Sequence, residues 1–330
     1  MAVLQDSFGR VVDDLRISIT DRCNFRCIYC MPEHGMQWLP KKEILSYEEI
    51  LRIARVMFDL GVITVRLTGG EPLVRPEMET LVRGLHALKP DLDLSMTTNG
   101  FFLEEKAARL AAGGLKRVNV SLDSMHPDRF ERMVRVDRRF YAKVLEGLDA
   151  ALAAGLGPVK VNVVLMKGYN EDEVLDFARL ARDRDVQVRF IEFMPLDAEG
   201  GWTRDLVVPG DDVFRQIHRV YPLEPVVEPH PEPATRFRFR DGRGGVGFIN
   251  SVTEPFCSSC NRMRLTADGQ IRTCLFSTRE HDVKSLLRAG ATDAELKRFI
   301  TRLVWTKEPG HRINEPDFIR PERSMSAIGG

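Results

Sequence analysis

Short apolar, β-branched runs alternate with stretches of helical periodicity from residue 15 to about residue 194. This alternation is typical of a parallel sheet whose strands are covered by helices. Six such runs predict strands over residues 15–20, 62–68, 92–97, 117–122, 159–166 and 186–193.

Two of the intervening stretches begin with a helix start signal. Ser46 is followed three residues later by Glu49, a capping-box pattern that predicts a helix over residues 46–60. Asn170 and Glu173 repeat the arrangement, with Asn170 as the expected N-cap of a helix over residues 170–181.

Polar or glycine-rich segments follow most of the predicted strands. They cover residues 20–21, 69–72, 98–100, 123–124 and 194–195. In barrels of strand–helix units, the loops after the strands meet at one face and carry the chemistry. The pattern therefore predicts an α/β fold, an incomplete (βα)6 TIM-type barrel with its reactive groups at that face.

The amino-acid composition changes after residue 195. Prolines at 222, 225, 229, 231 and 233 mark an extended connector that cannot be helical throughout. Short antiparallel strands are predicted over residues 235–240, 247–252 and 263–271, then helices over 282–288 and 293–305. We expect residues 1–221 to form the barrel, and residues 222–330 to form a smaller α+β part that closes its open side.

Charge and hydropathy exclude some classes of partner. The 48 basic and 48 acidic residues balance, so no overall field favours nucleic acid or a membrane surface. No apolar run is long enough to span a bilayer, and the first residues lack the pattern of a signal peptide. We expect a cytoplasmic protein.

The six cysteines fall into two triads, Cys23, Cys27 and Cys30, and Cys257, Cys260 and Cys274. A zinc ion or a 4Fe-4S cluster takes four ligands, so each triad leaves one metal position open. The short spacing of the first triad favours an iron–sulfur cluster, with zinc as the alternative. Disulfides are disfavoured because a chain of 330 residues does not need them to form a core.

Residues 21–32, DRCNFRCIYCMP, resemble the cluster motif of the radical S-adenosylmethionine family. The resemblance implies a 4Fe-4S cluster on the first triad, whose open iron binds the amino and carboxylate groups of S-adenosylmethionine. The GGEP segment at residues 69–72 resembles the family's contact with that amino group. The positions that match cofactor contacts are Tyr29, Gly70, Ser121 and Met194.

Residues 255–264, PFCSSCNRMR, with Cys274, resemble the auxiliary-cluster motif of the GTP 3',8-cyclases, which begin molybdenum cofactor biosynthesis. This implies a second 4Fe-4S cluster. The positions that match GTP contacts are Arg16, Arg66, Thr97, Lys160, Arg262, Met263 and Arg264. Lys160 lies near the beginning of its predicted strand, away from the reactive end. Without the neighbouring cysteines, Arg262 and Arg264 would be interpreted as two solvated arginines on an exposed strand.

The terminal Gly329 and Gly330 would ordinarily be read as a frayed end. They resemble the family's double-glycine tail, which reaches into the active site during catalysis. The resemblance assigns catalytic roles to these glycines together with Arg262 and Arg264.

The implied reaction begins with an electron that cleaves S-adenosylmethionine to methionine and a 5'-deoxyadenosyl radical. This radical removes the ribose C3' hydrogen of GTP, and the resulting carbon radical attacks C8 of guanine. The implied partners are GTP, an external electron donor and cyclic pyranopterin monophosphate synthase, which takes the product. The sequence does not set the oligomeric state, for which a homodimer is one candidate.

Two other functions fit part of the pattern. Radical S-adenosylmethionine maturases that modify peptides also carry C-terminal auxiliary clusters, although they usually need more cysteines. A zinc-stabilised nucleic-acid binder would use the cysteines structurally, but it would be expected to show a basic stripe.

Overall fold

The computed structural model describes residues 3–227 and 230–329, and all six strands predicted for the barrel form in it. They are β1 (Asp14–Ser18), β2 (Thr64–Thr68), β3 (Asp93–Thr98), β4 (Arg117–Ser121), β5 (Lys160–Leu165) and β6 (Gln187–Glu192). Each pairs in parallel with the next along the chain. The predicted incomplete TIM-type barrel is confirmed.

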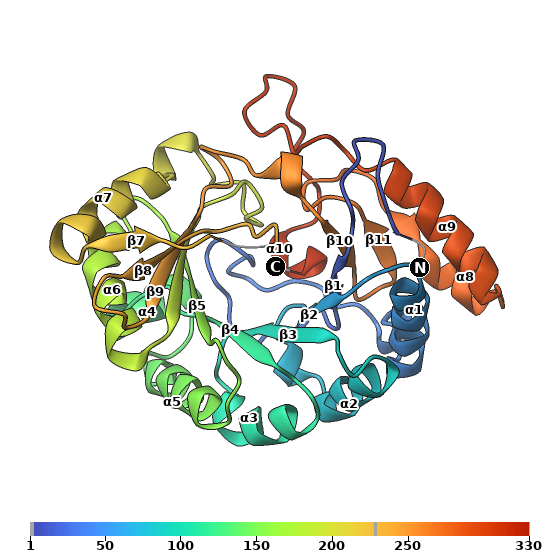
Figure 1. Ribbon diagram of the computed structural model, residues 1–330, viewed down its shortest axis with the longest axis horizontal. Helices are drawn as coiled ribbons and strands as arrows, with labels where there is room; N and C mark the ends of the chain where they lie inside the picture. The colour runs from blue at the N-terminus through green and yellow to red at the C-terminus, as the bar shows by residue number, and fades with distance from the viewer. Residues whose placement is uncertain (1–2, 228–229, 330) are drawn as a thin grey trace.

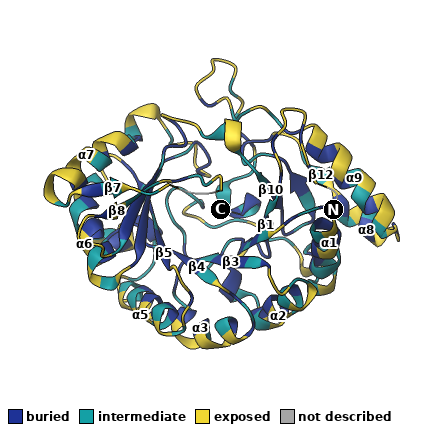
Figure 2. Cartoon of the chain, in the orientation of Figure 1, coloured by how far each residue is buried: buried dark blue, intermediate teal, exposed yellow. Residues whose placement is uncertain are grey.

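Helices cover the outside of this curved sheet (Figure 1). They are α1 (Tyr47–Asp59), α2 (Met78–Leu88), α3 (Leu103–Ala112), α4 (Pro127–Val134), α5 (Phe140–Ala153), α6 (Val174–Arg184) and α7 (Gly210–Val220). Their outer faces are exposed, whereas the strands are largely buried (Figure 2). The core therefore lies between the helices and the sheet, and the concave side of the sheet is left for function.

The two predicted capping boxes have different outcomes. Ser46 caps α1 as expected, because its side chain accepts from the backbone of Glu49 and the Glu49 side chain accepts in return. The second prediction is wrong, since α6 starts at Val174 after a short 3-10 turn and has no side-chain cap. The Asn170 side chain instead donates to the carbonyl oxygens of Asp123 and Val164, at 2.7 and 2.9 Å, and so joins the loop after β4 to β5.

The C-terminal part extends the same sheet at both edges. β9 (Gly245–Ile249) pairs in parallel with β6 and carries β8 (Thr235–Phe239) and β7 (Leu223–Pro225) beyond it. On the other side, β10 (Arg262–Leu265) pairs in parallel with β1 and carries β11 (Gln270–Arg272) and β12 (His281–Asp282). The predicted antiparallel strands form, as the pairs β8–β9 and β10–β11. The sequence did not indicate that β9 and β10 also pair in parallel with the barrel strands β6 and β1.

Both helices that the sequence predicted near the end of the chain are present. These are α8 (Val283–Arg288), which Asp282 caps, and α9 (Asp293–Trp305), followed by the short α10 (Met325–Ile328). Figure 1 shows α10 at the centre of the curved sheet, so the end of the chain returns into the barrel. No helix over the described residues is both long enough and apolar enough for a membrane span.

Candidate active site

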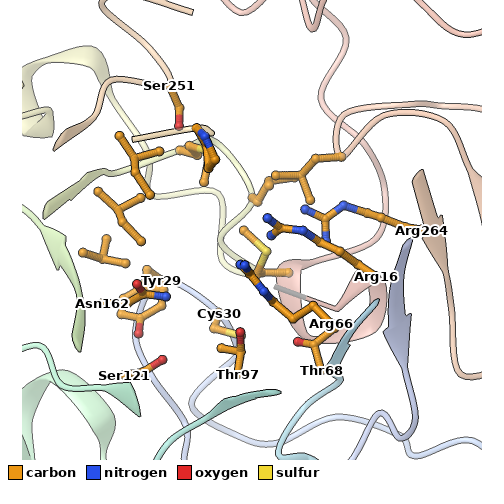
Figure 3. Close-up of a pocket in the computed structure, with 18 of the residues that line it drawn as sticks. Arg16, Tyr29, Cys30, Arg66, Thr68, Thr97, Ser121, Asn162, Ser251 and Arg264 are labelled. Carbon is orange, nitrogen blue, oxygen red and sulfur yellow. The ribbon is translucent and has the colours of Figure 1, made fainter. Parts of the chain in front are cut away.

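One cavity on the concave side of the sheet is lined by all six cysteines. The same cavity receives residues from β1 to β6, from β10 and from α10. Figure 3 shows Arg16, Arg66 and Arg264 reaching into it from one side, with Tyr29, Ser121 and Asn162 opposite them. The two triads therefore share a single space.

The loop that carries the first triad is held by an aromatic cluster and by backbone hydrogen bonds. The ring of Phe25 packs against the rings of Phe101, Phe130 and Phe140, with centroid distances of 6.3, 5.9 and 6.4 Å. The amide of Arg26 donates to the carbonyl oxygen of Val134 at the end of α4. Apolar packing thus positions a loop whose cysteines face the cavity.

The first-triad thiols lie in a desolvated place. Burial raises the pKa of Cys23 and of Cys30 to about 12, and it also raises the pKa of Cys27. A buried thiol becomes a thiolate when a metal replaces its proton. These cysteines are therefore unreactive as nucleophiles by themselves and suited to hold a metal group.

The double glycine after β2 is required by the cluster loop itself. A Cβ at Gly70 would lie 2.2 Å from the carbonyl oxygen of Arg22, and one at Gly69 would lie 2.5 Å from that of Thr20. The amide of Gly70 donates to the Thr20 oxygen at 2.8 Å. The GGEP segment therefore packs directly on the loop of the first triad, where only glycine fits.

Tyr29 is fixed by a buried carboxylate. Its hydroxyl donates to Asp123 at 2.7 Å, and the other oxygen of Asp123 accepts from the amide of Val164 at 2.9 Å. Burial raises the pKa of Asp123 to about 6. The phenol ring is thereby held at the cavity wall between the cluster loop and β5.

The second triad is assembled from two segments. Cys257 begins a 3-10 turn (Cys257–Ser259) before β10, Cys260 directly follows this turn, and Cys274 follows β11. Burial tends to raise the pKa of the Cys260 thiol, but the charges of Arg262 and Lys307, with hydrogen bonds from Arg262, lower it to about 6. Cys260 thus favours the thiolate form that a metal needs.

Three arginines form a row across β10, β1 and β2. Arg264 is in register with Arg16, and Arg16 is in register with Arg66. Burial lowers the pKa of each, to about 10 for Arg66, and the charges of Arg66 and Arg262 lower that of Arg16 further. Buried like charges placed side by side destabilise a fold unless an anion lies between them.

Within the described residues, no carboxylate pairs with these three guanidinium groups. Arg66 donates to the hydroxyl of Ser95 at 3.4 Å, whereas Nε of Arg16 is buried without a hydrogen-bond partner. Arg16 as a whole is only 8% exposed. An unpartnered, buried cation that faces a cavity indicates a site for an anionic ligand.

The tail of the chain lies against this cavity, which Met325 of α10 lines. The guanidinium group of Arg264 donates to the carbonyl oxygen of Gly329. Gly329 has φ +89°, and a Cβ there would lie 2.9 Å from Cβ of Ser18. Gly330, the other predicted tail residue, lies outside the described residues.

The tail is also anchored farther back. Arg323 forms ion pairs with Asp268 at 2.7 Å and with Glu280 at 2.8 Å, and the amide of Met325 donates to the carbonyl oxygen of Leu196. Gly329 is therefore brought to the row of arginines by a fixed segment.

Comparison with known proteins agrees with this geometry. Residues 17–181 match the Radical SAM superfamily, and residues 186–313 match the family described as Molybdenum Cofactor Synthesis C. A GTP 3',8-cyclase of Streptomyces coelicolor is 49% identical to the chain, over 99% of the chain and 96% of that protein. The chain belongs to the GTP 3',8-cyclase family of radical S-adenosylmethionine enzymes.

Further relatives support this membership. GTP 3',8-cyclase 2 of Mycobacterium tuberculosis is 47% identical, over 99% of the chain and 92% of that protein. The crystal structure of Streptococcus suis SuiB bound to S-adenosylmethionine has a TM-score of 0.59 at 14% identity, covering 96% of this chain and 77% of that one, which shows the shared fold.

Family membership favours the cyclase over the other functions considered. The full-length relatives support neither a peptide-modifying maturase nor a zinc-stabilised nucleic-acid binder. Radical S-adenosylmethionine enzymes use a 4Fe-4S cluster and S-adenosylmethionine. Within the described residues, no three His, Cys, Asp or Glu side chains are arranged to hold a single metal ion.

The structure brings most of the predicted site residues into the cavity. Those that line it are Arg16, Tyr29, Arg66, Gly70, Thr97, Ser121, Met194, Arg262 and Arg264, with the six cysteines. Three of the described predicted residues, Met263, Lys160 and Gly329, are not among them. Met263 turns its side chain into the hydrophobic core, because neighbours on a strand face opposite sides. Lys160 lies at the first position of β5, as the sequence indicated, where Glu232 is 3.6 Å from its ammonium group.

Several residues of the site were not singled out from the sequence. Arg189 on β6 lines the cavity and forms an ion pair of 2.5 Å with Glu232. In the sequence, Asp123 is recognisable only as a polar residue after a strand. A charged residue inside the apolar run 186–193 was a readable signal for Arg189, but the contact of Asp123 with Tyr29 spans 94 positions and leaves no local pattern.

Proposed function

We propose that the chain converts GTP to 3',8-cyclo-7,8-dihydro-GTP in the cavity between the two triads. The row of Arg264, Arg16 and Arg66 is the observation that carries this proposal, because it places unpaired positive charge where a nucleotide triphosphate or a purine oxygen would bind. The names of the full-length relatives support the same substrate.

We assign Cys23, Cys27 and Cys30 to the 4Fe-4S cluster, and Tyr29, Gly70, Ser121 and Met194 to S-adenosylmethionine. When bound, these groups supply the 5'-deoxyadenosyl radical. The chain's own part is to hold the cofactor against the wall formed by Tyr29 and β4, and to keep water from the reacting carbon.

We assign Cys257, Cys260 and Cys274 to a second 4Fe-4S cluster. The three thiols fit such a group because they line the cavity from two segments and because the thiol of Cys260 has a pKa of about 6. In this assignment the second site binds the guanine edge and fixes which ribose hydrogen faces the first site. Thr97, Lys160 and the arginines, with the backbone of Met263, contact the rest of GTP.

We assign a catalytic role to the tail. Gly329 already contacts Arg264, so the tail lies beside the row of arginines on which we place the ligand. Arg262 and Arg264 complete this catalytic group.

The wider setting is part of the proposal. An external electron donor reduces the first cluster, and cyclic pyranopterin monophosphate synthase receives the product. We place the enzyme in the cytoplasm, with a homodimer as the candidate assembly. The functional division near residue 221 falls between α7 and β7.

An anaerobic assay with reductant, S-adenosylmethionine and GTP tests the proposal. We expect 5'-deoxyadenosine and a cyclised purine to form together, and we expect no product when a peptide replaces GTP. The proposal would be overturned if GTP did not stimulate the cleavage of S-adenosylmethionine and no purine product formed.

A further inference from the structure

Lys307 lies directly after α9 and is buried beside the second cysteine triad. It is only 3% exposed, although lysine is among the residues that are rarely buried unless they are paired. Lys307 does not line the cavity between the two triads. Its environment must therefore explain why an ammonium group is kept there.

The ammonium group of Lys307 joins the two segments that form the triad. It donates to the carbonyl oxygen of Arg262 at 2.8 Å and to the carbonyl oxygen of Thr273. Arg262 is two positions after Cys260, and Thr273 immediately precedes Cys274. One side chain thus holds β10 and the end of β11 in a fixed relation.

The charge of Lys307 is not balanced by the protein. Within residues 3–227 and 230–329, no Asp or Glu forms an ion pair with it. Arg10 offers a contrast, since it also contacts this loop by donating to the carbonyl oxygen of Cys257 at 2.8 Å, but it is paired with the buried Asp6. A buried cation whose only partners are carbonyl oxygens is costly unless an anion lies nearby.

The cysteines of the triad lie next to this charge. The two carbonyl partners of Lys307, on Arg262 and Thr273, are within two positions of Cys260 and Cys274. Three thiolates around a metal cluster would supply the missing negative charge. The ammonium group and the metal group would then neutralise one another.

We propose that Lys307 is a positioning residue for the cluster of the second triad, which it holds together through two carbonyl groups and whose negative charge it offsets. This inference rests on the proposed function, because it requires a cluster at that site. A fixed cation beside a cluster favours its more reduced form, so Lys307 raises the reduction potential of the second cluster.

The test compares Lys307→Met, which removes the charge and both hydrogen bonds, with Lys307→Arg, which keeps the charge. Lys284→Met is the matched control, because Lys284 pairs with Glu43 and lies outside the cavity. Iron, sulfide and the potential of each cluster are measured on anaerobic protein by redox titration with EPR detection.

We expect Lys307→Met to lower the potential of the second cluster or to lose its iron, with the first cluster unchanged. Lys307→Arg and Lys284→Met should keep wild-type values. If Lys307→Met does not fold, Lys307→Gln, which keeps a donor without the charge, replaces it in the comparison. A second cluster of normal content and potential in the uncharged variant would overturn the inference. Only one cluster in the unmodified protein would instead overturn the proposed function.

Discussion

The guanidinium group of Arg264 donates a hydrogen bond to the carbonyl oxygen of Gly329, so the end of the chain contacts the arginine row inside the barrel. This contact joins two segments that are 65 positions apart. It also explains why the tail residue is glycine, since its φ of +89° and the nearby Cβ of Ser18 exclude a side chain.

Replacing Gly329 by alanine should therefore move the tail. We expect turnover of GTP to fall by about tenfold or more, because the added Cβ meets Ser18 and the positive φ disfavours alanine. Steady-state assays measure the effect. Gly290→Ala is the matched control, since Gly290 has φ +86° with open space around it and lies away from the cavity.

Deleting Gly329 and Gly330 should abolish turnover while both clusters keep their iron and their spectra. The cysteines are held by other segments, so the loss would be specific to the tail. Normal turnover by the truncated protein would contradict the catalytic role of the two glycines.

Replacing Cys257, Cys260 or Cys274 by alanine should separate the two half-reactions. Cleavage of S-adenosylmethionine should continue at the first site, whereas conversion of GTP should stop because the guanine is no longer oriented. Chromatography of 5'-deoxyadenosine and of the purine product measures both. Cys27→Ala is the control and should abolish both. Conversion of GTP by a second-triad variant would refute the assignment.

Arg16→Met should change stability and binding in opposite directions. Removing a buried, unpaired charge between two other arginines should raise the free energy of unfolding by about 1 kcal/mol, or the melting temperature by about 2–4 °C. The same change should weaken GTP binding more than about tenfold, because a charged hydrogen bond to the ligand is lost. Calorimetry measures both.

Arg55→Met provides the control for Arg16. Arg55 is an exposed helix residue that pairs with Asp293 at 3.0 Å, so its loss should alter neither quantity appreciably. An Arg16 variant that is less stable, or that binds GTP normally, would show that the row of arginines has a structural role.

Affinity for GTP should fall as pH rises above about 7. Burial and the charge of Arg189 lower the pKa of Lys160 from 10.5 to about 7, so the free protein loses this proton at mildly alkaline pH. The negative triphosphate favours the ammonium form of Lys160, so Lys160 takes up a proton when GTP binds. Above pH 7, the affinity for GTP should therefore fall by at most about tenfold per pH unit. Titration calorimetry in two buffers measures the uptake.

Lys160→Met should bind GTP more weakly and without this dependence on pH. The exposed Lys167→Met should retain the wild-type dependence. A pH dependence of binding that persists in Lys160→Met would assign the proton to another group.

The lowered pKa of Lys160 also has a consequence for stability. The pKa of Lys160 in the folded protein lies below its value in the unfolded chain, so the free energy of unfolding should rise from pH 7 to about 10.5.

The barrel could be predicted from the sequence because each strand–helix unit has a local pattern. The six strands and the helices α8 and α9 formed where apolar periodicity and capping residues placed them. The Asn170 capping box failed because the same polar side chains made tertiary hydrogen bonds to the loop after β4. Local propensity loses when a distant partner satisfies the group better.

The pairing of the C-terminal strands could not be predicted from local pattern. No local sequence pattern in β9 or β10 indicates that these strands pair with β6 and β1. The cysteine, S-adenosylmethionine and arginine positions came largely from family motifs. The cavity position of Arg189 and the bond between Tyr29 and Asp123 depend on contacts across the barrel and appeared only in three dimensions.

The most direct test of the account is Mössbauer and EPR spectroscopy on the full chain, isolated without oxygen. We expect two 4Fe-4S clusters in each chain. GTP should perturb the spectrum of the cluster on Cys257, Cys260 and Cys274, and S-adenosylmethionine should perturb the spectrum of the other cluster. A single cluster, or zinc at the second triad, would contradict it.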